Sequence, residues 1–416
     1  MNPSLSVISR SGLNRKRKRE ETMEEVKSNI ENGILTVQLS GRISSSNAAG
    51  IEAEINKLAD QSGDDLAVLD CEGLEYISSA GLRVILRLKK SSPSLKIINA
   101  SSEVYDIFEM TGFTEMMEVK KAYRRLSVDG CKMLGRGSNG EVYRIDDETI
   151  IKVYKNSDAL PEIQRERELA RKAFILGIPT AIPYDVVRVG EGYGSVFELI
   201  NSKSFSDLII NEPENIDKYI SLSEDLLKKI HSVELKPGEM PDMRETALSW
   251  ADFLKEHLPE DIHKKLVSLI SDVPASCKML HGDYHMKNVL MQNGEVILID
   301  MDTLCLGDPI FEFGSIYNGY AGFSELDHSV TESFLGIPWE TAQYIWDKTV
   351  RMYFDTDDEA KISEIKTKSE IIGQTRIMRR SIKRLSGTEF GKKQIECSRR
   401  HLIELVPKTD SLLLFQ

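Results

Sequence analysis

The sequence has few cysteines, no long apolar segment and no excess of positive charge. No segment reaches the roughly 18 apolar residues that a membrane helix needs, and the first 20 residues lack the apolar core of a secretory signal. The formal net charge of -12 argues against nucleic acid or an anionic membrane surface as a partner. The cysteines show no Cys-x-x-Cys pair and no zinc-like spacing. They are Cys71, Cys131, Cys277, Cys305 and Cys397. We therefore predict reduced thiols in a cytoplasmic protein that binds neither nucleic acid nor membrane.

The length of 416 residues is more than one hydrophobic core usually serves, so at least two domains are expected. Residues 1–28 form a basic tail that we predict to be disordered, because short charge runs at chain ends are usually solvated. The run Arg15–Arg19 could instead be a nuclear-localisation or polyanion-binding element. Met23 follows closely and is an alternative start of the protein.

Residues 29–122 alternate short β-like runs with helical periods. This alternation predicts a small α/β domain with helices packed on a sheet. The expected strands are 34–39, 66–70, 95–99 and an edge strand at 115–119, and the expected helices are 48–58, 82–89 and 103–110.

Inside this domain, residues 69–86 read Leu-Asp-Cys-Glu-Gly-Leu-Glu-Tyr-Ile-Ser-Ser-Ala-Gly-Leu-Arg-Val-Ile-Leu. The segment resembles the signature of STAS domains, the anti-sigma factor antagonist family. The resemblance implies a protein partner and a phosphate-accepting serine at the start of a helix. Ser79 falls on that position, and the preceding residue, commonly Asp in the family, is Ser78 here.

The residues themselves also give these two serines a local role. Ser78 and Ser79 precede a helical run that begins near Gly81, where a hydroxyl can cap free N–H groups. A phosphate there would also meet the positive end of the helix dipole. An unmodified capping serine is the alternative to a phosphorylation site.

Residues 128–416 open with three glycines, Gly135, Gly137 and Gly140, at the spacing of a kinase nucleotide loop. Glycines let the backbone turn tightly and approach phosphates closely. A dinucleotide-binding fold would need a helix directly after them. Residues 141–145 and 149–154 instead read as two strands joined by a turn.

Lys152 lies in the second of these strands, where a kinase places the lysine that holds the α- and β-phosphates. A surface lysine on an edge strand is the alternative. The helical run 162–174 carries Glu166 and Glu168 at a distance suited to pairing with this lysine. We prefer Glu166 as the partner.

The strongest chemical pattern is His-Gly-Asp-Tyr-His-Met-Lys-Asn at 281–288, followed by Ile-Asp-Met-Asp at 299–302. Phosphoryl transfer needs a carboxylate to orient the attacking hydroxyl or accept its proton. It also needs oxygen ligands for magnesium. Asp283, Asn288 and Asp300 supply both.

This pattern resembles the aminoglycoside phosphotransferase and choline kinase superfamily over Gly130 to about Gly314. The resemblance implies a bilobal α+β fold like that of protein kinases, with an N-lobe at about 128–197 and a C-lobe at about 201–416. The expected fold class is therefore multidomain, with the small α/β STAS-like domain preceding the kinase-like phosphotransferase domain.

The resemblance also implies ATP and Mg²⁺ as cofactors and assigns residue roles. Asp283 is the catalytic base, and Asn288 and Asp300 are magnesium ligands. His285 either lies near the transferring phosphate or braces the loop. Asp302 either assists at the metal or hydrogen-bonds the loop.

Two further segments fit the same family pattern. Residues 195–200 resemble the hinge between the lobes, where backbone groups, here those of Glu198 and Ile200, read adenine. Gly-Asp-Pro at 307–309 is followed by Glu312 where the family usually has Asp, and we expect this change to concern loop scaffolding more than chemistry.

We therefore predict an ATP- and magnesium-dependent phosphotransferase that acts on a hydroxyl of a small molecule, with a STAS domain for regulation or partner binding. The alternatives are a serine protein kinase or self-phosphorylating regulator, and an inactive nucleotide-binding scaffold. No Ala-Pro-Glu triplet follows Asp300, which disfavours a protein kinase. The complete set of lysine, base and metal ligands disfavours the scaffold. The acidic run at 355–359 could bind a cationic acceptor or simply begin a helix.

Overall fold

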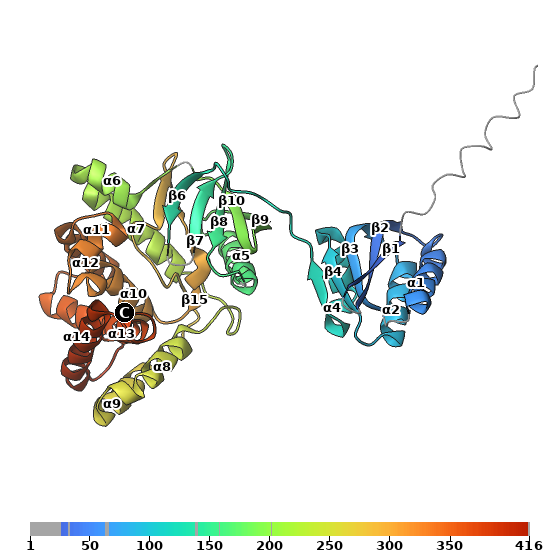
Figure 1. Ribbon diagram of the computed structural model, residues 1–416. Coiled ribbons are helices and arrows are strands. Elements are labelled where there is room, and N and C mark those ends of the chain that lie inside the picture. The colour runs from blue at the N-terminus through green and yellow to red at the C-terminus, as the bar shows by residue number, and fades with distance from the viewer. Residues whose placement is uncertain are drawn as a thin grey trace, which may run out of the picture. The chain divides into compact units, whose positions relative to one another are not determined.

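Figure 1 shows a computed structural model that describes residues 26–31, 34–62, 66–137, 140–157, 159–200 and 202–414. The chain divides into two compact units between Arg125 and Leu126. In the part of the chain described, no helix is both long and apolar enough to cross a membrane. The basic run Arg15–Arg19 and Met23 lie outside the described residues.

The first unit contains a five-stranded sheet in the order β1-β2-β3-β4-β5. β1 pairs antiparallel with β2, and all other neighbours are parallel. The strands are β1 (Val26–Glu31), β2 (Ile34–Ile43), β3 (Leu66–Ile77), β4 (Lys96–Ala100) and β5 (Val119–Lys121). Val37, Leu69 and Ile97 are in register on three neighbouring strands and fully buried, so they form the centre of this core.

Four helices cover this sheet. They are α1 (Ala48–Ser62), α2 (Ser79–Ser91), α3 (Ser102–Met110) and α4 (Phe113–Met116). α1 packs against α2, and α3 packs against β3 and β5. The buried residues of α2 recur at helical spacing, which gives one apolar face toward the core. The predicted small α/β domain is confirmed.

Two predicted elements of this unit were wrong. Residues 26–28 belong to β1 and not to a disordered tail, because they pair with residues 37–39 of β2. The edge strand predicted at 115–119 lies at 119–121 instead. Phe113 and Met117 are one helical turn apart and both are buried, so the chain first makes the short helix α4.

The start of α2 also differs from its predicted position. The helix begins at Ser79 and not near Gly81. Ser78 is the N-cap residue, and its hydroxyl accepts the N–H of Gly81 at 3.4 Å. Ser79 is the first helical residue and its side chain is exposed.

The second unit begins with an antiparallel five-stranded sheet in the order β6-β7-β8-β10-β9. Its elements are β6 (Lys132–Arg136), β7 (Gly140–Arg144), β8 (Thr149–Tyr154), α5 (Leu160–Ile175), β9 (Pro183–Val189) and β10 (Gly192–Glu198). The glycines are followed by the β7–β8 hairpin and not by a helix, which excludes the dinucleotide-binding fold. Because β8 is the central strand, Lys152 is not an edge-strand lysine.

The rest of this unit is mainly helical, with two small sheets in the orders β11-β13-β14 and β12-β15. Its strands are β11 (Lys203–Ser204), β12 (Met279–Leu280), β13 (Val289–Gln292), β14 (Glu295–Leu298) and β15 (Cys305–Leu306). Its α-helices are α6 (Phe205–Asn211), α7 (Ile216–His231), α8 (Met243–Phe253), α9 (Glu260–Ser271), α10 (Pro309–Tyr320), α11 (Ser329–Leu335), α12 (Trp339–Tyr353), α13 (Glu359–Leu385) and α14 (Glu389–Leu405). The short 3₁₀ turns are η1 (Pro213–Asn215), η2 (Lys255–His257), η3 (Met301–Thr303), η4 (Gly322–Ser324) and η5 (Val406–Lys408). A sheet lobe followed by a helical lobe is the predicted bilobal kinase-like fold.

Helix α10 is the buried centre of the helical lobe and crosses α13 at close range. A Cβ on Gly314 of α10 would lie 2.4 Å from a side-chain atom of Ile372 on α13. A Cβ on Gly373 of α13 would lie 2.4 Å from the ring of Tyr317. These two glycines therefore let the helix backbones approach, and α13 comes within reach of the loop before α10.

Candidate active site

Lys152 joins three elements through its ammonium group. Its Nζ lies 2.9 and 3.1 Å from the carboxylate oxygens of Glu166 on α5, and 3.0 Å from Oδ1 of Asp300 after β14. Burial lowers the pKa of Lys152, but the charges of Asp300, Glu166 and Asp302 outweigh this and hold the pKa above its usual value. Glu168, the other sequence candidate, is exposed. The structure therefore brings the predicted lysine together with Glu166 and one predicted metal ligand.

Tyr154 is a further member of this cluster that the sequence analysis did not single out. Its hydroxyl donates a short hydrogen bond to Oε2 of Glu166. Burial and the charge of Glu166 raise the pKa of Tyr154, so the phenol stays a neutral donor. Residues two apart on a strand share a face, so the spacing of Tyr154 from Lys152 could have identified Tyr154 from the sequence.

The three predicted loop glycines, of which Gly135 belongs to β6 and Gly140 begins β7, differ in what the fold requires of them. A Cβ on Gly140 would lie 2.3 Å from the carbonyl oxygen of Val153, so β7 and β8 can pair only with glycine there. Among the described residues, a Cβ on Gly135 would meet nothing within 4 Å, and one on Gly137 only a carbonyl oxygen at 3.9 Å. The small size of Gly135 and Gly137 suits the close approach of another molecule, since no described residue crowds either of them. Residues 138 and 139 lie outside the described residues.

The predicted hinge follows β10. The Glu198 N–H donates to the Ile182 carbonyl at 3.3 Å, and the Leu199 N–H donates to the Glu148 carbonyl at 2.7 Å. The Ile200 carbonyl accepts the N–H of Ser202 at 2.9 Å. Residue 201 lies outside the described residues. The part of Glu198 and Ile200 in reading adenine stays a prediction.

The loop of residues 281–288 is held by side chains from distant parts of the chain. The buried carboxylate of Glu312 accepts the N–H groups of His281 at 2.5 Å and Gly282 at 2.9 Å. Ser315 and Arg376 donate to the Gly282 carbonyl at 2.8 and 2.9 Å. Gly282 has φ +80°, and a Cβ there would lie 2.6 Å from the carbonyl oxygen of Thr303. The backbone on both sides of Gly282 is therefore fixed, in agreement with the expected scaffolding role of Glu312.

Asp283 presents a half-buried carboxylate from this loop. Nε2 of His285 lies 3.7 Å from its Oδ2, and Nη2 of Arg376 lies 4.0 Å from its Oδ1. Burial raises the pKa of Asp283, but the nearby His285 and the charges of Arg376 and His281 outweigh it and hold the pKa well below its usual range. His285 is itself buried edge-on against the ring of Phe334, with ring centroids 5.0 Å apart. The arrangement gives an ionised carboxylate in a fixed position.

Asn288 and Asp300 are linked through the backbone. The Asn288 amide nitrogen donates to the Asp283 carbonyl at 3.1 Å, which leaves its amide oxygen as the atom able to coordinate a metal. The Ile299 N–H donates to the Asn288 carbonyl at 3.0 Å, which ties the loop to the segment carrying Asp300. Asp300 has φ +64°, a left-handed conformation that non-glycine residues rarely adopt and that often marks functional sites.

Two neighbouring carboxylates make this segment suited to a cation. Burial and the charge of Asp300 together raise the pKa of Asp302 to about 7. Carboxylate and amide oxygens are the ligands that Mg²⁺ prefers. The oxygen donors of Asn288, Asp300 and Asp302 thus have the chemistry that suits a magnesium ion, and the small size of Gly135 and Gly137 suits a nearby phosphate chain.

The sequence analysis missed Arg376 as well as Tyr154. Arg376 lies on α13, 94 residues after the Gly282 carbonyl to which it donates. No local pattern marks it, because its contact depends on how α13 crosses α10.

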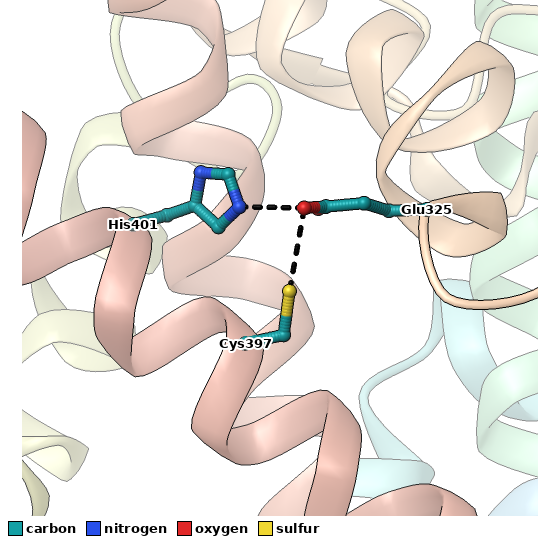
Figure 2. A group of neighbouring side chains, drawn as sticks. All are labelled: Glu325, Cys397 and His401. Carbon is teal, nitrogen blue, oxygen red and sulfur yellow. Dashed lines mark hydrogen bonds and ion pairs between the residues drawn. The ribbon is translucent and has the colours of Figure 1, made fainter.

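A second polar cluster lies among the later helices (Figure 2). The carboxylate oxygen Oε1 of Glu325 lies 2.6 Å from Nε2 of His401 and accepts a hydrogen bond from Cys397 at 3.3 Å. Nδ1 of His401 lies 2.5 Å from Glu370 on α13. Hydrogen bonds to both carboxylates raise the pKa of His401 to about 9. Although cysteine, histidine and glutamate are also metal ligands, both ring nitrogens already have carboxylate partners, so a histidinium ion pair accounts for the arrangement.

Comparison with known families agrees with this geometry. Residues 131–338 match the sequence model described as "Phosphotransferase enzyme family". The chain belongs to the phosphotransferase enzyme family. Residues 25–126 match the model of the STAS domain, so this member carries a STAS domain before its phosphotransferase region.

Individual relatives resemble each part of this phosphotransferase family member. BtrV of Bordetella bronchiseptica, named as an anti-sigma factor antagonist, is 37% identical over 91 residues, which cover 21% of this chain and 78% of BtrV. The solved structure of aminoglycoside phosphotransferase APH(4)-Ia is 12% identical, with a TM-score of 0.47, and the match covers 68% of this chain and 94% of that one. The gentamicin complex of APH(2")-IIa is 14% identical, with a TM-score of 0.45, and the match covers 74% and 98%.

Proposed function

We propose that this phosphotransferase uses ATP and Mg²⁺ to phosphorylate a hydroxyl group of a small molecule. The observation that carries the proposal is the position of Lys152, bound at once by Glu166 of the sheet lobe and by Asp300 of the helical lobe. A half-buried lysine held charged between two carboxylates suits the binding of nucleotide phosphates. The family match supports phosphotransferase chemistry.

Each residue of the site then has a task. Lys152 contacts the α- and β-phosphates, while Glu166 and Tyr154 keep it aimed. Gly135 and Gly137 let the loop backbone approach the phosphates. Mg²⁺, held by Asn288 and Asp300, would neutralise charge on the β- and γ-phosphates.

Asp283 orients the acceptor. Its ionised carboxylate accepts a hydrogen bond from the acceptor hydroxyl, whose oxygen attacks the γ-phosphorus. The bond from that phosphorus to the β–γ bridging oxygen breaks, ADP leaves, and the hydroxyl proton passes to Asp283 and then to water. The buried ring of His285, near one carboxylate oxygen and packed on Phe334, supports a positioning role for that histidine.

Replacement of the base tests this proposal. Asp283→Ala should slow phosphate transfer by about 10² to 10⁴, the usual effect of losing a general base. Binding of Mg·ATP, measured by calorimetry, should stay within a few fold, because the nucleotide contacts are elsewhere. Asp225→Asn, which changes an exposed aspartate on α7, is the matched control. Equal transfer rates in Asp283→Ala and parent would refute the role of the base, and nucleotide binding without transfer in the parent would instead favour an inactive scaffold.

We also propose that Ser79 of the STAS domain accepts phosphate and that the phosphate controls binding of a protein partner. Ser79 is exposed, lies at the first position of α2, and is not needed as the helix cap, because Ser78 has that role. A phosphate there would meet the positive end of the helix dipole.

A cytoplasmic location, where cysteines stay reduced, fits the absence of disulfides between the five described cysteines.

A further inference from the structure

The C-terminal half of α13 carries an unusual concentration of positive charge. Between Glu370 and Glu389 the sequence contains no carboxylate but five cations. They are Arg376, Arg379, Arg380, Lys383 and Arg384. Their spacing places them along one side of the helix. The chain as a whole has a net charge of -12, so the positive charge of this stretch is opposite in sign to that of the whole chain.

The first half of the same helix provides an internal comparison. Residues 359–370 contain three acidic and three basic side chains. Ion pairs there include Lys368 with Glu364 at 2.6 Å, and Lys366 with Asp347 of α12 at 2.5 Å. In the second half, among the described residues, no ion pair with a carboxylate is found for Arg379, Arg380, Lys383 or Arg384. The charge of α13 is therefore balanced in one half and unbalanced in the other.

The unbalanced stretch begins at the proposed base. Arg376 lies 4.0 Å from the Asp283 carboxylate and donates to the carbonyl of the neighbouring Gly282. Arg380 lies one turn further along α13, and the charge of Asp283 acts to raise its pKa against the stronger lowering by burial. Arg376 therefore borders the proposed position of the acceptor hydroxyl, and the other cations follow it along the same side of α13.

Three of the cations beyond Arg376 lie near aromatic rings and form no ion pair with a described carboxylate. The Arg380 guanidinium lies 5.1 Å from the ring centroid of Phe323, and Arg379 and Lys383 lie 6.0 and 4.9 Å from that of Phe253. Burial lowers the pKa of Arg380, and the positive charges of Arg384 and Arg376 lower it further. The same causes lower the pKa of Arg379. Mutual repulsion between cations is a cost that a bound anion would remove.

Three of the four acidic side chains at 355–359, which could attract a cationic acceptor, already have partners. Asp358 caps the N-terminus of α13 by accepting the N–H of Ala360 at 2.9 Å. Glu359 and Asp357 pair with Arg351 at 2.8 and 3.8 Å. Of the two interpretations of the acidic run, a site for a cationic acceptor or the start of a helix, the contacts support the start of a helix.

We propose that the acceptor is an anionic hydroxyl compound, with a carboxylate or phosphate bound by Arg379 and Arg380 while its hydroxyl meets Asp283. The inference rests on the proposed phosphotransferase function and names its substrate class. An anion brought next to the Asp283 carboxylate is repelled by it, and the neighbouring arginines offset that repulsion. Arginine suits both carboxylate and phosphate, because its planar fork matches their paired oxygens.

Binding is measured first, with the full chain and Mg·ADP. The probe is 3-phosphoglycerate, which carries a hydroxyl, a carboxylate and a phosphate. The Arg379→Gln/Arg380→Gln variant should bind it about tenfold or more weakly than the parent, the effect of losing one charge-assisted hydrogen bond or more. Arg171→Gln, at an exposed arginine of α5, should bind as the parent does. Arg379→Lys/Arg380→Lys, which keeps the charge, should retain part of the affinity, and thermal unfolding of each variant shows that it is folded.

Turnover is measured next with three acceptors of one carbon skeleton: glycerol, glycerate and 3-amino-1,2-propanediol. The parent should prefer glycerate, and the double glutamine variant should lose that preference with KM for ATP unchanged. Asp283-dependent transfer that favours the neutral or the amino compound would overturn this inference and leave the proposed function standing. Arginine-dependent binding of 3-phosphoglycerate without any transfer would support the anion site and count against the proposed function. Equal binding of 3-phosphoglycerate by parent and double variant would overturn the inference whatever the turnover.

Discussion

Asp300 combines two properties at the scale of a single residue. Its backbone is left-handed, at a cost of order 1 kcal/mol or more for a non-glycine residue. Its carboxylate faces Lys152 and lies beside Asp302, whose pKa it helps to raise. A residue kept in a costly conformation beside a like charge suggests that function, not stability, determines its identity.

Asp300→Asn separates these two properties. Asparagine adopts left-handed backbone readily, so the melting temperature should stay close to that of the parent. Loss of the carboxylate removes the proposed magnesium ligand, and magnesium-dependent transfer should fall by about 10² or more. The measurement is initial rate against magnesium concentration at saturating ATP, with Asp302→Asn made in parallel. An unchanged magnesium response in Asp300→Asn together with a changed one in Asp302→Asn would move the metal role to Asp302.

The residues that the sequence revealed are those whose chemistry is local. Lys152 lies in a strand after a glycine turn, and Asp283 and Asn288 lie five apart on one loop, so pattern and spacing were enough to choose them. Arg376 and Tyr154 could not be chosen in the same way. Arg376 reaches the loop only because α13 crosses α10 at the glycine contact, and no run of neighbouring residues encodes that crossing.

At the scale of elements, the sequence predicted the strands with strong apolar patterns and missed the weak ones. β1 carries the mixed segment Val-Lys-Ser-Asn-Ile-Glu, and most of its described side chains are exposed. Its place is set by pairing with β2 and not by its own composition. α4 is a single turn, too short for a periodicity to be recognised. Short elements take their conformation from tertiary contacts that a sequence window does not contain.

Glu325, Cys397 and His401 (Figure 2), together with Glu370, join three parts of the helical lobe. Glu325 follows η4, Glu370 belongs to α13, and the other two belong to α14. The cluster should therefore contribute to the stability of α14 against the rest of the lobe. On α14, the guanidinium of Arg400 also contacts the sulfur of Cys397, at 3.6 Å.

His401→Gln should reduce stability in a pH-dependent way. The pKa of His401 is about 9 in the folded chain, above the unfolded value of about 6.5. The stabilisation is therefore fully present below about pH 6.5 and is lost as the pH rises through 9. We expect a difference in unfolding free energy between parent and variant on the order of 2 kcal/mol at pH 6.5 that shrinks by pH 10.

Denaturant titrations of parent and variant at several pH values measure this difference in unfolding free energy. Because both proteins contain the other titratable groups, the contributions of those groups cancel in the difference. His257→Gln, at an exposed histidine of η2, should show no such pH-dependent difference. A deficit in His401→Gln that stays constant from pH 6.5 to pH 10 would contradict the ion-pair explanation.

At the scale of the whole molecule, one chain carries a phosphotransferase family region and a STAS domain. Each has its own buried core. Transfer within one chain is first order and does not depend on protein concentration, whereas transfer between chains does. The chain therefore permits a direct test of whether the catalytic unit acts on its own STAS domain.

Phosphorylation of Ser79 is expected on incubation with Mg·ATP, either alone or with cell extract. Intact-mass and peptide mass spectrometry should place the added phosphate on the peptide that contains Ser79, and Ser79→Ala should lack it. Loss of the signal in Asp283→Ala, without extract, identifies the chain's own active site as the source.

Ser78→Ala is the structural control, because it removes the cap of α2 at a cost of about 1 kcal/mol and leaves Ser79 available. A parent that acquires no phosphate on Ser79 in either condition would make the STAS domain an unmodified binding module.

The support of the loop that carries Asp283 has a consequence for protein synthesis. Glu312 and Arg376 lie 30 and 94 residues after Gly282, whose backbone they hold. At roughly 5–20 residues per second, the ribosome adds Arg376 roughly 5–20 s after the loop. For most of that interval the nascent chain contains every motif residue up to Asp302 but lacks Arg376, one of the two side chains that donate to the Gly282 carbonyl. Activity should therefore begin only after α13 has left the ribosome and packed on α10, which delays phosphate transfer until most of the helical lobe has been made.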